Sequence, residues 1–125
     1  MASRAERLAT DANVWFAAVR ADGRPHLTPI WFVYVDDHMW LCTGIDAVKA
    51  RLVRANPQVS VALEDGNAPV AGEGTAAVRP VVEAPPGVRA AFLAKYQWDI
   101  AEDPGCVLID ITITKWLSPG STVVT

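Results

Sequence analysis

The sequence has few of the groups that carry metal or thiol chemistry. Among its 125 residues are two cysteines, Cys42 and Cys106, and two histidines, His26 and His38, and their spacing matches no zinc site. Both cysteines lie in apolar, strand-like segments, where cysteine usually acts as a small buried hydrophobic residue, and a disulfide or catalytic thiol is the alternative. Both histidines flank turns, which favours surface or capped positions. No nucleophile–histidine arrangement can be proposed from residue order.

The sequence also lacks an excess of positive charge and any long apolar run. Its net charge of -3 argues against general nucleic-acid binding, which usually needs a basic surface. No apolar run is long enough to span a bilayer, and residues 1–7 lack the apolar stretch of a signal peptide. We therefore expect a cytoplasmic protein that binds neither nucleic acid nor membranes.

The residues that are present are typical of a globular domain, since 51% are hydrophobic and 20% are charged. A chain of this length can bury about two-thirds of its unfolded surface in one core. We therefore expect residues 1–125 to form a single domain, with an N-terminal helix within residues 1–12 and a loose tail at residues 119–125.

Turn residues divide most of the chain into short strands. Asp22-Gly23 lies between two apolar segments and predicts a tight hairpin that joins strands 13–20 and 25–35. Further strands are expected at 38–43, 58–64, 70–82 and 106–117, and helices at 46–55 and 85–98. Because no βαβ unit repeats, the pattern predicts a mainly β fold with short helices (α+β), a largely antiparallel barrel of about six strands.

The second strand, residues 25–35, is apolar on both sides beyond Thr28. A strand with two apolar sides is usually covered on both. We expect the barrel interior to cover one side and a helix or a partner subunit to cover the other.

Basic residues near a predicted helix start are the first candidates for binding an anion. Lys49 lies near the start of helix 46–55, where free N–H groups and the helix dipole favour phosphate and where Asp46 can cap the helix. Arg51 and Arg54 share a helix face about 150° from Lys49, so the three do not converge on one phosphate in a regular helix. The alternative for each is a solvated side chain.

Tryptophan is unusually frequent, with five residues. Trp15, Trp31 and Trp40 fall in expected strands, which indicates core or subunit-interface positions. Trp98 ends a predicted helix and Trp116 lies near the end of the last strand. Either could wall a planar ligand, and the alternative for each is packing against the barrel.

The segment from Asp22 to Gln58 contains the hairpin turn, two apolar strands, the sequence Val48-Lys49-Ala50-Arg51, and Asn56-Pro57. It resembles the split β-barrel family that includes pyridoxamine-phosphate oxidases and their deazaflavin-dependent relatives. The resemblance extends over roughly residues 13–117. It implies a split β-barrel of the FMN-binding type that forms a homodimer, with a cofactor at the subunit interface.

The resemblance also implies which residues contact the cofactor and the substrate. Lys49 matches the lysine that contacts the cofactor phosphate, and Thr43, Gly44 and Arg51 are further candidates nearby. Trp98 and Trp116 are the candidates for the substrate pocket. The backbone groups expected to face the pyrimidine side of a flavin or deazaflavin ring are those near Thr28, Pro29, Ile30 and Trp31.

The chain departs from the family at two basic positions. The oxidases carry an arginine in the second strand that holds the FMN phosphate, and this strand has none after Arg24, which favours the branch that uses coenzyme F420. Many members of that branch have a basic residue two positions before the lysine, where this chain has Ala47, and Arg51 is a candidate replacement.

We therefore expect an oxidoreductase that transfers a hydride between coenzyme F420 and a small-molecule substrate, with the cofactor supplying the difficult chemistry. One alternative is an FMN-binding protein similar to the pyridoxamine-phosphate oxidases. Another is a non-catalytic protein that binds a flavin, a deazaflavin or haem.

Overall fold

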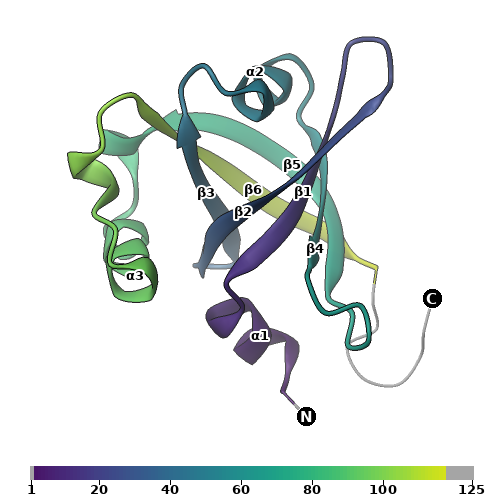
Figure 1. Ribbon diagram of the computed structural model, residues 1–125, viewed down its shortest axis with the longest axis horizontal. Helices are drawn as coiled ribbons and strands as arrows, with labels where there is room; N and C mark the ends of the chain where they lie inside the picture. The colour runs from purple at the N-terminus through teal and green to yellow at the C-terminus, as the bar shows by residue number, and fades with distance from the viewer. Residues whose placement is uncertain (1, 118–125) are drawn as a thin grey trace.

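Six antiparallel strands close into a barrel in the computed structural model, which describes residues 2–117 (Figure 1). Around the barrel the strand order is β1-β2-β3-β6-β5-β4. The strands are β1 (Asn13–Val19), β2 (Pro25–Val35), β3 (His38–Gly44), β4 (Gln58–Leu63), β5 (Ala71–Pro80) and β6 (Cys106–Trp116). The helices are α1 (Arg4–Thr10), α2 (Val48–Ala55) and α3 (Pro86–Tyr96), with 3₁₀ turns η1 (Val81–Glu83) and η2 (Ile100–Glu102). The predicted fold class is confirmed, and the predicted tail lies outside the described residues.

Three predicted element boundaries were wrong by two residues, and one of them is the end of the helix expected at 85–98, which stops at Tyr96 because Gln97 adopts a left-handed conformation. The strand expected at 70–82 ends at Pro80, because the chain turns into η1 there. Asp46 does not cap α2, which begins at Val48 with Ala47 in the cap position and no side-chain cap. The cause is a turn in which the Ala47 N–H donates to the Gly44 carbonyl at 3.0 Å, so that Asp46 lies one residue too early.

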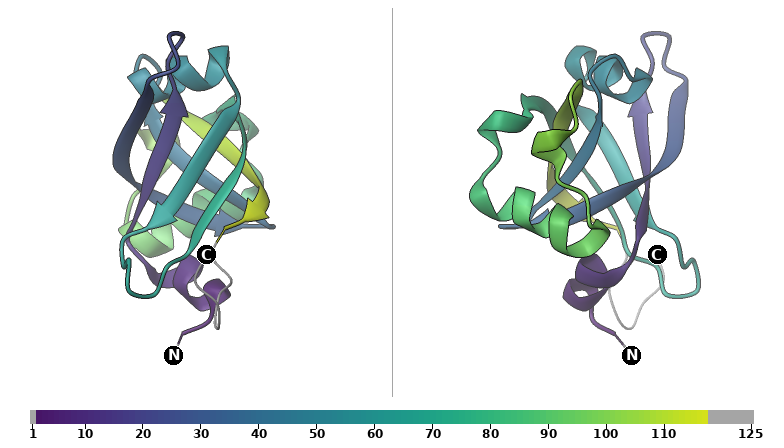
Figure 2. Two further views of the ribbon diagram at one scale, coloured as in Figure 1. Left: turned by 90° about the vertical axis from the view of Figure 1, so that its right-hand side faces the viewer. Right: turned by 60° about the vertical axis from the view of Figure 1, so that its left-hand side comes forward.

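Alternate residues of each strand fill the barrel interior, as the period-two pattern of a strand requires. The most completely buried side chains there include Phe16, Phe32 and Leu41. Leu8 of α1 and Val53 of α2 pack against the same cluster. Figure 2 shows these two helices at opposite ends of the barrel, so the core extends from one to the other.

A second hydrophobic cluster lies outside the barrel, between β3, β6 and α3. Val33 and Trp40 of the sheet pack here with Phe92 of α3. The expectation that both sides of strand 25–35 are covered therefore holds near Val33. Toward the start of the strand no helix within the described residues covers the outer side, and Leu27 is 58% exposed and Trp31 45%, so coverage of this part by a partner subunit stays a prediction.

The Tyr96 hydroxyl joins α3 to two segments that are distant in sequence. It accepts a hydrogen bond from the Phe32 N–H at 3.0 Å and lies 2.7 Å from the Ala12 carbonyl oxygen. The Tyr96 ring stacks on Trp31, with centroids 4.4 Å apart and ring planes at 9°. These contacts fix the position of α3 relative to β2.

Lys95 is expected to make stability depend on alkaline pH. Its Nζ donates to the Phe32 carbonyl at 2.9 Å and lies 3.8 Å from the Phe32 ring centroid. Burial lowers the pKa of Lys95 from 10.5 to about 8, against the opposing charge of Asp11. Between these pH values the unfolded chain binds more protons than the folded one, so stability rises with pH across this window. Denaturant unfolding should show wild type gaining stability over Lys95→Met across it, and a constant difference would contradict the prediction.

Candidate functional site

Although the six strands close into a barrel, β2 and β3 separate along the first half of β2 and leave an opening there. β2 pairs with β1 over residues 25–31, whereas its pairing with β3 is confined to residues 32–35. The end of β3, residues 42–44, pairs with β6 on its other side. Figure 1 shows β2 diverging from β3 toward the β1–β2 hairpin. Among the described residues, the first half of β2 therefore has no strand partner on this side.

The register of the β1–β2 hairpin determines which backbone groups face this opening. The Arg20 N–H donates to the Arg24 carbonyl at 2.9 Å, and hydrogen-bonded pairs then recur at every second residue. Thr28 and Ile30 consequently direct their backbone groups to β1, whereas Leu27 and Pro29 direct theirs to the opening. Proline has no N–H to leave unpaired, which suits an edge. Of the backbone groups predicted to face a ring, those of Pro29 and Trp31 therefore lie at the opening.

The Thr28 side chain shares the inner side of β2 with Ile30 and Phe32. Its Oγ1 is buried and has no hydrogen-bond partner among the described residues. A buried polar atom left unpaired costs about 1–3 kcal/mol, so such atoms usually have a partner. The free hydroxyl therefore fits a site that a ligand or an ordered water completes.

His26 precedes Thr28 on the same side of β2 and is half-buried. Arg20 Nη2 lies 3.1 Å from His26 Nδ1. Burial lowers the pKa of His26, and the positive charges of Arg20 and Lys49 lower it further. Three cationic or ionisable side chains thus gather near one another, and we call Arg20, His26 and Lys49 the basic cluster.

Lys49 is the member of the basic cluster that the sequence predicted. It is half-buried on α2, has no side-chain hydrogen bond or ion pair within residues 2–117, and burial lowers its pKa. Arg51 and Arg54 are exposed on another face of the helix, and Arg54 Nη1 donates to the Ile45 carbonyl at 3.1 Å. The predicted divergence of these side chains is therefore observed, and Arg51 does not join Lys49.

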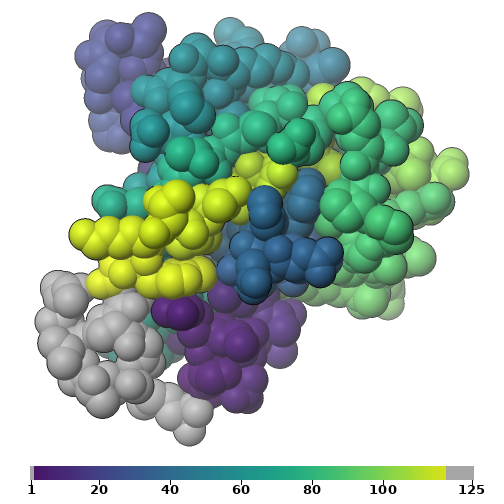
Figure 3. All heavy atoms as spheres, turned by 180° about the vertical axis from the view of Figure 1, so that it is seen from behind, coloured from purple at the N-terminus to yellow at the C-terminus, as the bar shows by residue number. Residues whose placement is uncertain are grey.

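The β1–β2 hairpin and α2 project from the same end of the barrel in both views of Figure 2. Figure 3 shows from behind that the hairpin projects at one corner of the molecule, beside the α2 region. The hairpin tip carries its own ion pair, Asp22 with Arg24 at 2.7 Å, so these charges neutralise each other. The basic cluster consequently offers positive charge that no carboxylate pairs with among the described residues, and it is suited to binding an anion. It lies at the end of the barrel where β3 ends with Thr43 and Gly44 and α2 follows.

The outer side of the same strands is apolar and exposed. Trp15 pairs with Pro29 across β1 and β2, and Leu27 and Trp31 flank Pro29 on the same side. All four residues are exposed, and we call them the outer apolar face. A contiguous exposed apolar surface of this kind usually marks an interaction site.

The two tryptophans predicted to wall a substrate pocket lie apart, in different hydrophobic clusters. Trp98 packs edge-on against Trp31 at 6.1 Å, and its Nε1 donates to Asp103 at 3.0 Å. Trp116 packs near Tyr34, and the Arg4 guanidinium lies 4.4 Å from its ring centroid. The structure therefore does not bring Trp98 and Trp116 together around one ligand.

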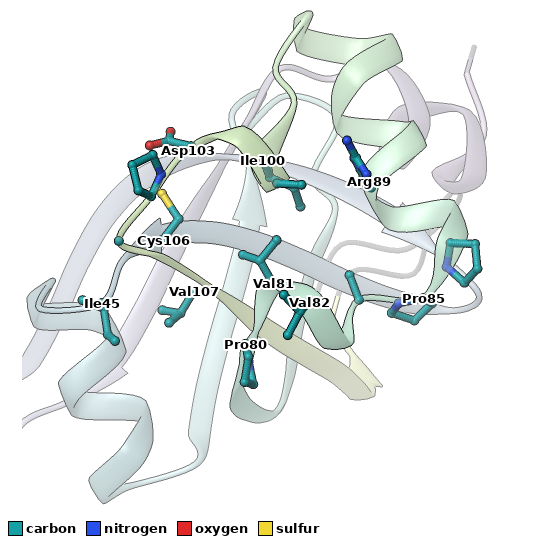
Figure 4. Close-up of a pocket in the computed structure, with 15 residues that line it drawn as sticks. Ile45, Pro80, Val81, Val82, Pro85, Arg89, Ile100, Asp103, Cys106 and Val107 are labelled. Carbon is teal, nitrogen blue, oxygen red and sulfur yellow. The ribbon is translucent and has the colours of Figure 1, made fainter.

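A separate pocket of about 820 Å³ lies between η1, η2 and the start of α3 (Figure 4). Its walls are largely apolar, as Ile45, Val81 and Ile100 illustrate, and no member of the basic cluster lines it. Two charged residues line this pocket: Arg89 makes two hydrogen bonds of 2.8 Å to Asp99, and Asp103 accepts one of 3.0 Å from Trp98 Nε1. The pocket therefore presents little free charge.

The cysteines offer no activated thiol among the described residues. Cys42 is buried, and burial raises the pKa of its thiol to about 12. Burial also raises the pKa of Cys106. A nucleophilic cysteine needs a lowered pKa, so neither is suited to thiolate chemistry at neutral pH. No group of three potential metal ligands is assembled within residues 2–117.

Comparison with solved structures supports the architecture. A conserved hypothetical protein from Mycobacterium tuberculosis is 26% identical with a TM-score of 0.73, over 93% of this chain and 83% of that one. An F420 reductase is 21% identical with a TM-score of 0.68, over 87% and 91% of the two chains. An FAD-binding protein from Mesorhizobium loti is 25% identical with a TM-score of 0.65, over 88% and 87%.

No curated protein sequence matches the chain significantly. None of the helices within residues 2–117 has the length and apolar character needed to cross a membrane. The family profile described as pyridoxamine 5'-phosphate oxidase matches residues 4–118, which is nearly the whole chain. The chain therefore belongs to the pyridoxamine 5'-phosphate oxidase family.

Proposed function

We propose that the protein is an oxidoreductase that binds coenzyme F420 and transfers a hydride between it and a small-molecule substrate. The observation that carries the proposal is the basic cluster next to the unpartnered Thr28 hydroxyl, at the end of an open strand edge. Family membership and the structural likeness to an F420 reductase support it. When bound, the cofactor supplies the hydride chemistry.

The chain's own residues would hold and orient this group. Lys49 offers an unpaired ammonium to the phosphate, and the Thr28 hydroxyl can give or accept one hydrogen bond. The backbone groups of Leu27 and Pro29 at the opening can pair with the polar edge of a flat ring, as they would with a neighbouring strand. These roles need no acid or base from the protein at the reacting atoms.

We further propose that two copies of the chain pair through the outer apolar face. Trp15 and Trp31 are 39% and 45% exposed, which is costly for large aromatic side chains that remain in water. The face lies on the same strands as the open edge, so a second copy seated on it would help to exclude water from the cofactor. Sedimentation equilibrium tests this directly, and a monomer at micromolar concentration would contradict it.

The proposed cofactor site is tested by titrating the protein with F420 and with FMN while tryptophan fluorescence is followed. Lys49→Ala is expected to weaken binding about 10- to 100-fold, because one hydrogen bond to a charged group is worth about 1.5–3 kcal/mol. Arg54→Ala is the matched control on the same helix and should leave the affinity unchanged. Failure of both cofactors to bind would overturn the proposed function.

An FMN-binding function is the second candidate, and one observation favours it. The oxidases in the family use an arginine of the second strand for the FMN phosphate. Here β2 lacks that arginine, but its own His26 and the adjacent Arg20 offer two nitrogen-bearing groups. Tighter binding of FMN than of F420 in the same titration would decide for this candidate.

A further inference from the structure

The hydrogen bond between Arg20 and His26 constrains the protonation of the imidazole. Arg20 Nη2 lies 3.1 Å from His26 Nδ1, and a guanidinium can only donate. His26 Nδ1 must therefore accept, which places the single ring proton on Nε2. In this state His26 is neutral and keeps the Arg20 guanidinium bound to its own ring.

The groups around His26 oppose its protonation as long as no anion is present. Its charged neighbours are Arg20 from the end of β1 and Lys49 from α2, and both repel a second positive charge. At the hairpin tip, Asp22 is engaged with Arg24. No carboxylate within residues 2–117 forms an ion pair with His26. Burial acts in the same direction and is the largest contribution to its lowered pKa.

An anion bound among these groups reverses the balance, because its negative charge offsets those of Arg20 and Lys49 and favours a positive charge on His26. We propose that His26 takes up a proton from solvent when a phosphate group binds at the basic cluster, and that this protonation frees Arg20 to bind the same anion. Once Nδ1 carries a proton it can no longer accept from Arg20, so the guanidinium turns to the oxyanion. Lys49 holds the anion in either state.

At the site of the proposed function, anion binding would thus be coupled to proton uptake by His26. This inference rests on the proposed function for the identity of the anion. Its consequence is that the affinity for an anion of constant charge increases as the pH falls through the His26 transition. If the bound anion raises the pKa of His26 by one unit, the anion binds about tenfold more tightly to the protein with protonated His26 than to the protein with neutral His26.

Sulfate is the probe of choice because, unlike a phosphate monoester, it stays a dianion between pH 6 and pH 8. Calorimetric titration of the full chain in two buffers of different ionisation enthalpy gives both the affinity and the number of protons taken up. Wild type is expected to bind sulfate about five- to tenfold more tightly at pH 6 than at pH 8, with net proton uptake. Equal affinity at both pH values would overturn the proposal.

His26→Gln keeps a side-chain N–H donor but cannot gain a proton, so it should bind sulfate with little dependence on pH. His38→Gln is the matched control, because His38 lies 2.6 Å from Asp110 and outside the basic cluster. It should behave like wild type. A pH dependence that persists in His26→Gln would contradict the assignment to His26.

A second measurement does not depend on the folding of a variant. The ring proton resonances of His26 in the wild-type protein, followed by NMR over the same pH range, report its titration directly. Sulfate is expected to raise the midpoint, and an unchanged midpoint would overturn the proposal. If sulfate couples to His26 while F420 and FMN both fail to bind, the proposed function falls and this inference stands. If a cofactor binds without proton uptake, the proposed function stands and this inference falls.

Discussion

Replacing Gly74 with alanine is expected to lower the free energy of unfolding by about 3 kcal/mol or more. Gly74 lies at the irregularity in the pairing of β5 with β6, where the register shifts between Glu73 and Gly74. A Cβ at this position would lie deep inside the van der Waals radius of the Thr112 carbonyl oxygen and 3.0 Å from Ile113 Cα. These are backbone atoms that cannot rotate away, so the two strands would have to separate.

Two other glycines provide a graded comparison for this prediction. At Gly72 an added Cβ would meet the side chain of Ile113 at 2.9 Å, which can move, so Gly72→Ala should cost less than Gly74→Ala. At Gly66 nothing lies within 4 Å, so Gly66→Ala should change little. Denaturant unfolding followed by circular dichroism measures all three. The steric explanation is wrong if Gly74→Ala is as stable as Gly66→Ala.

The second large effect is expected at Asp110, whose carboxylate connects three strands. Asp110 is 7% exposed on β6, and its two oxygens lie 2.6 Å from His38 Nδ1 of β3 and 2.8 Å from Arg79 Nε of β5. Asp110→Ala would remove the carboxylate that binds both His38 and Arg79, and it should lower the free energy of unfolding by about 2–3 kcal/mol. The cost stays below that of a fully buried pair because water can reach His38 and Arg79 once the carboxylate is gone.

Asp110→Asn separates the charge of this residue from its shape. The amide keeps one acceptor oxygen and nearly the same volume, so it should destabilise the protein less than Asp110→Ala. Asp22→Ala is the control, because its ion pair with Arg24 is exposed and exposed pairs contribute little to stability. Chemical denaturation at neutral pH compares the three variants. Equal stability of Asp110→Ala and Asp22→Ala would show that the bridge does not stabilise the barrel.

Local signals in the sequence were sufficient to predict most of the barrel. Asp22-Gly23 placed the hairpin correctly, since Gly23 adopts a φ of 90° that the turn requires. The strand expected at 25–35 has these bounds in the structure, because Pro25 and the Asp36-Asp37 turn delimit it. Such features depend on a few neighbouring residues, which is why a single sequence contains them.

The features that were missed depend on pairing between distant segments. His26 was interpreted as a surface or capped residue, although the alternation that placed Ile30 and Phe32 on one side of the strand placed His26 there too. Its contact with Arg20 depends on the hairpin register, in which His26 lies opposite Ala18 and Arg20 directly follows the end of β1. The partners of Asp110 come from two other strands, and no local pattern specifies that arrangement.

The alternation of β2 has a consequence for how the family could diversify. Residues at even positions, such as His26 and Thr28, face inward, whereas those at odd positions, such as Leu27 and Trp31, face outward. Neighbouring codons are therefore exposed to different selective pressures. Point mutations can retune one side of the strand without altering the other, whereas a single-residue insertion or deletion within it would exchange the two sides at once and is expected to be purged.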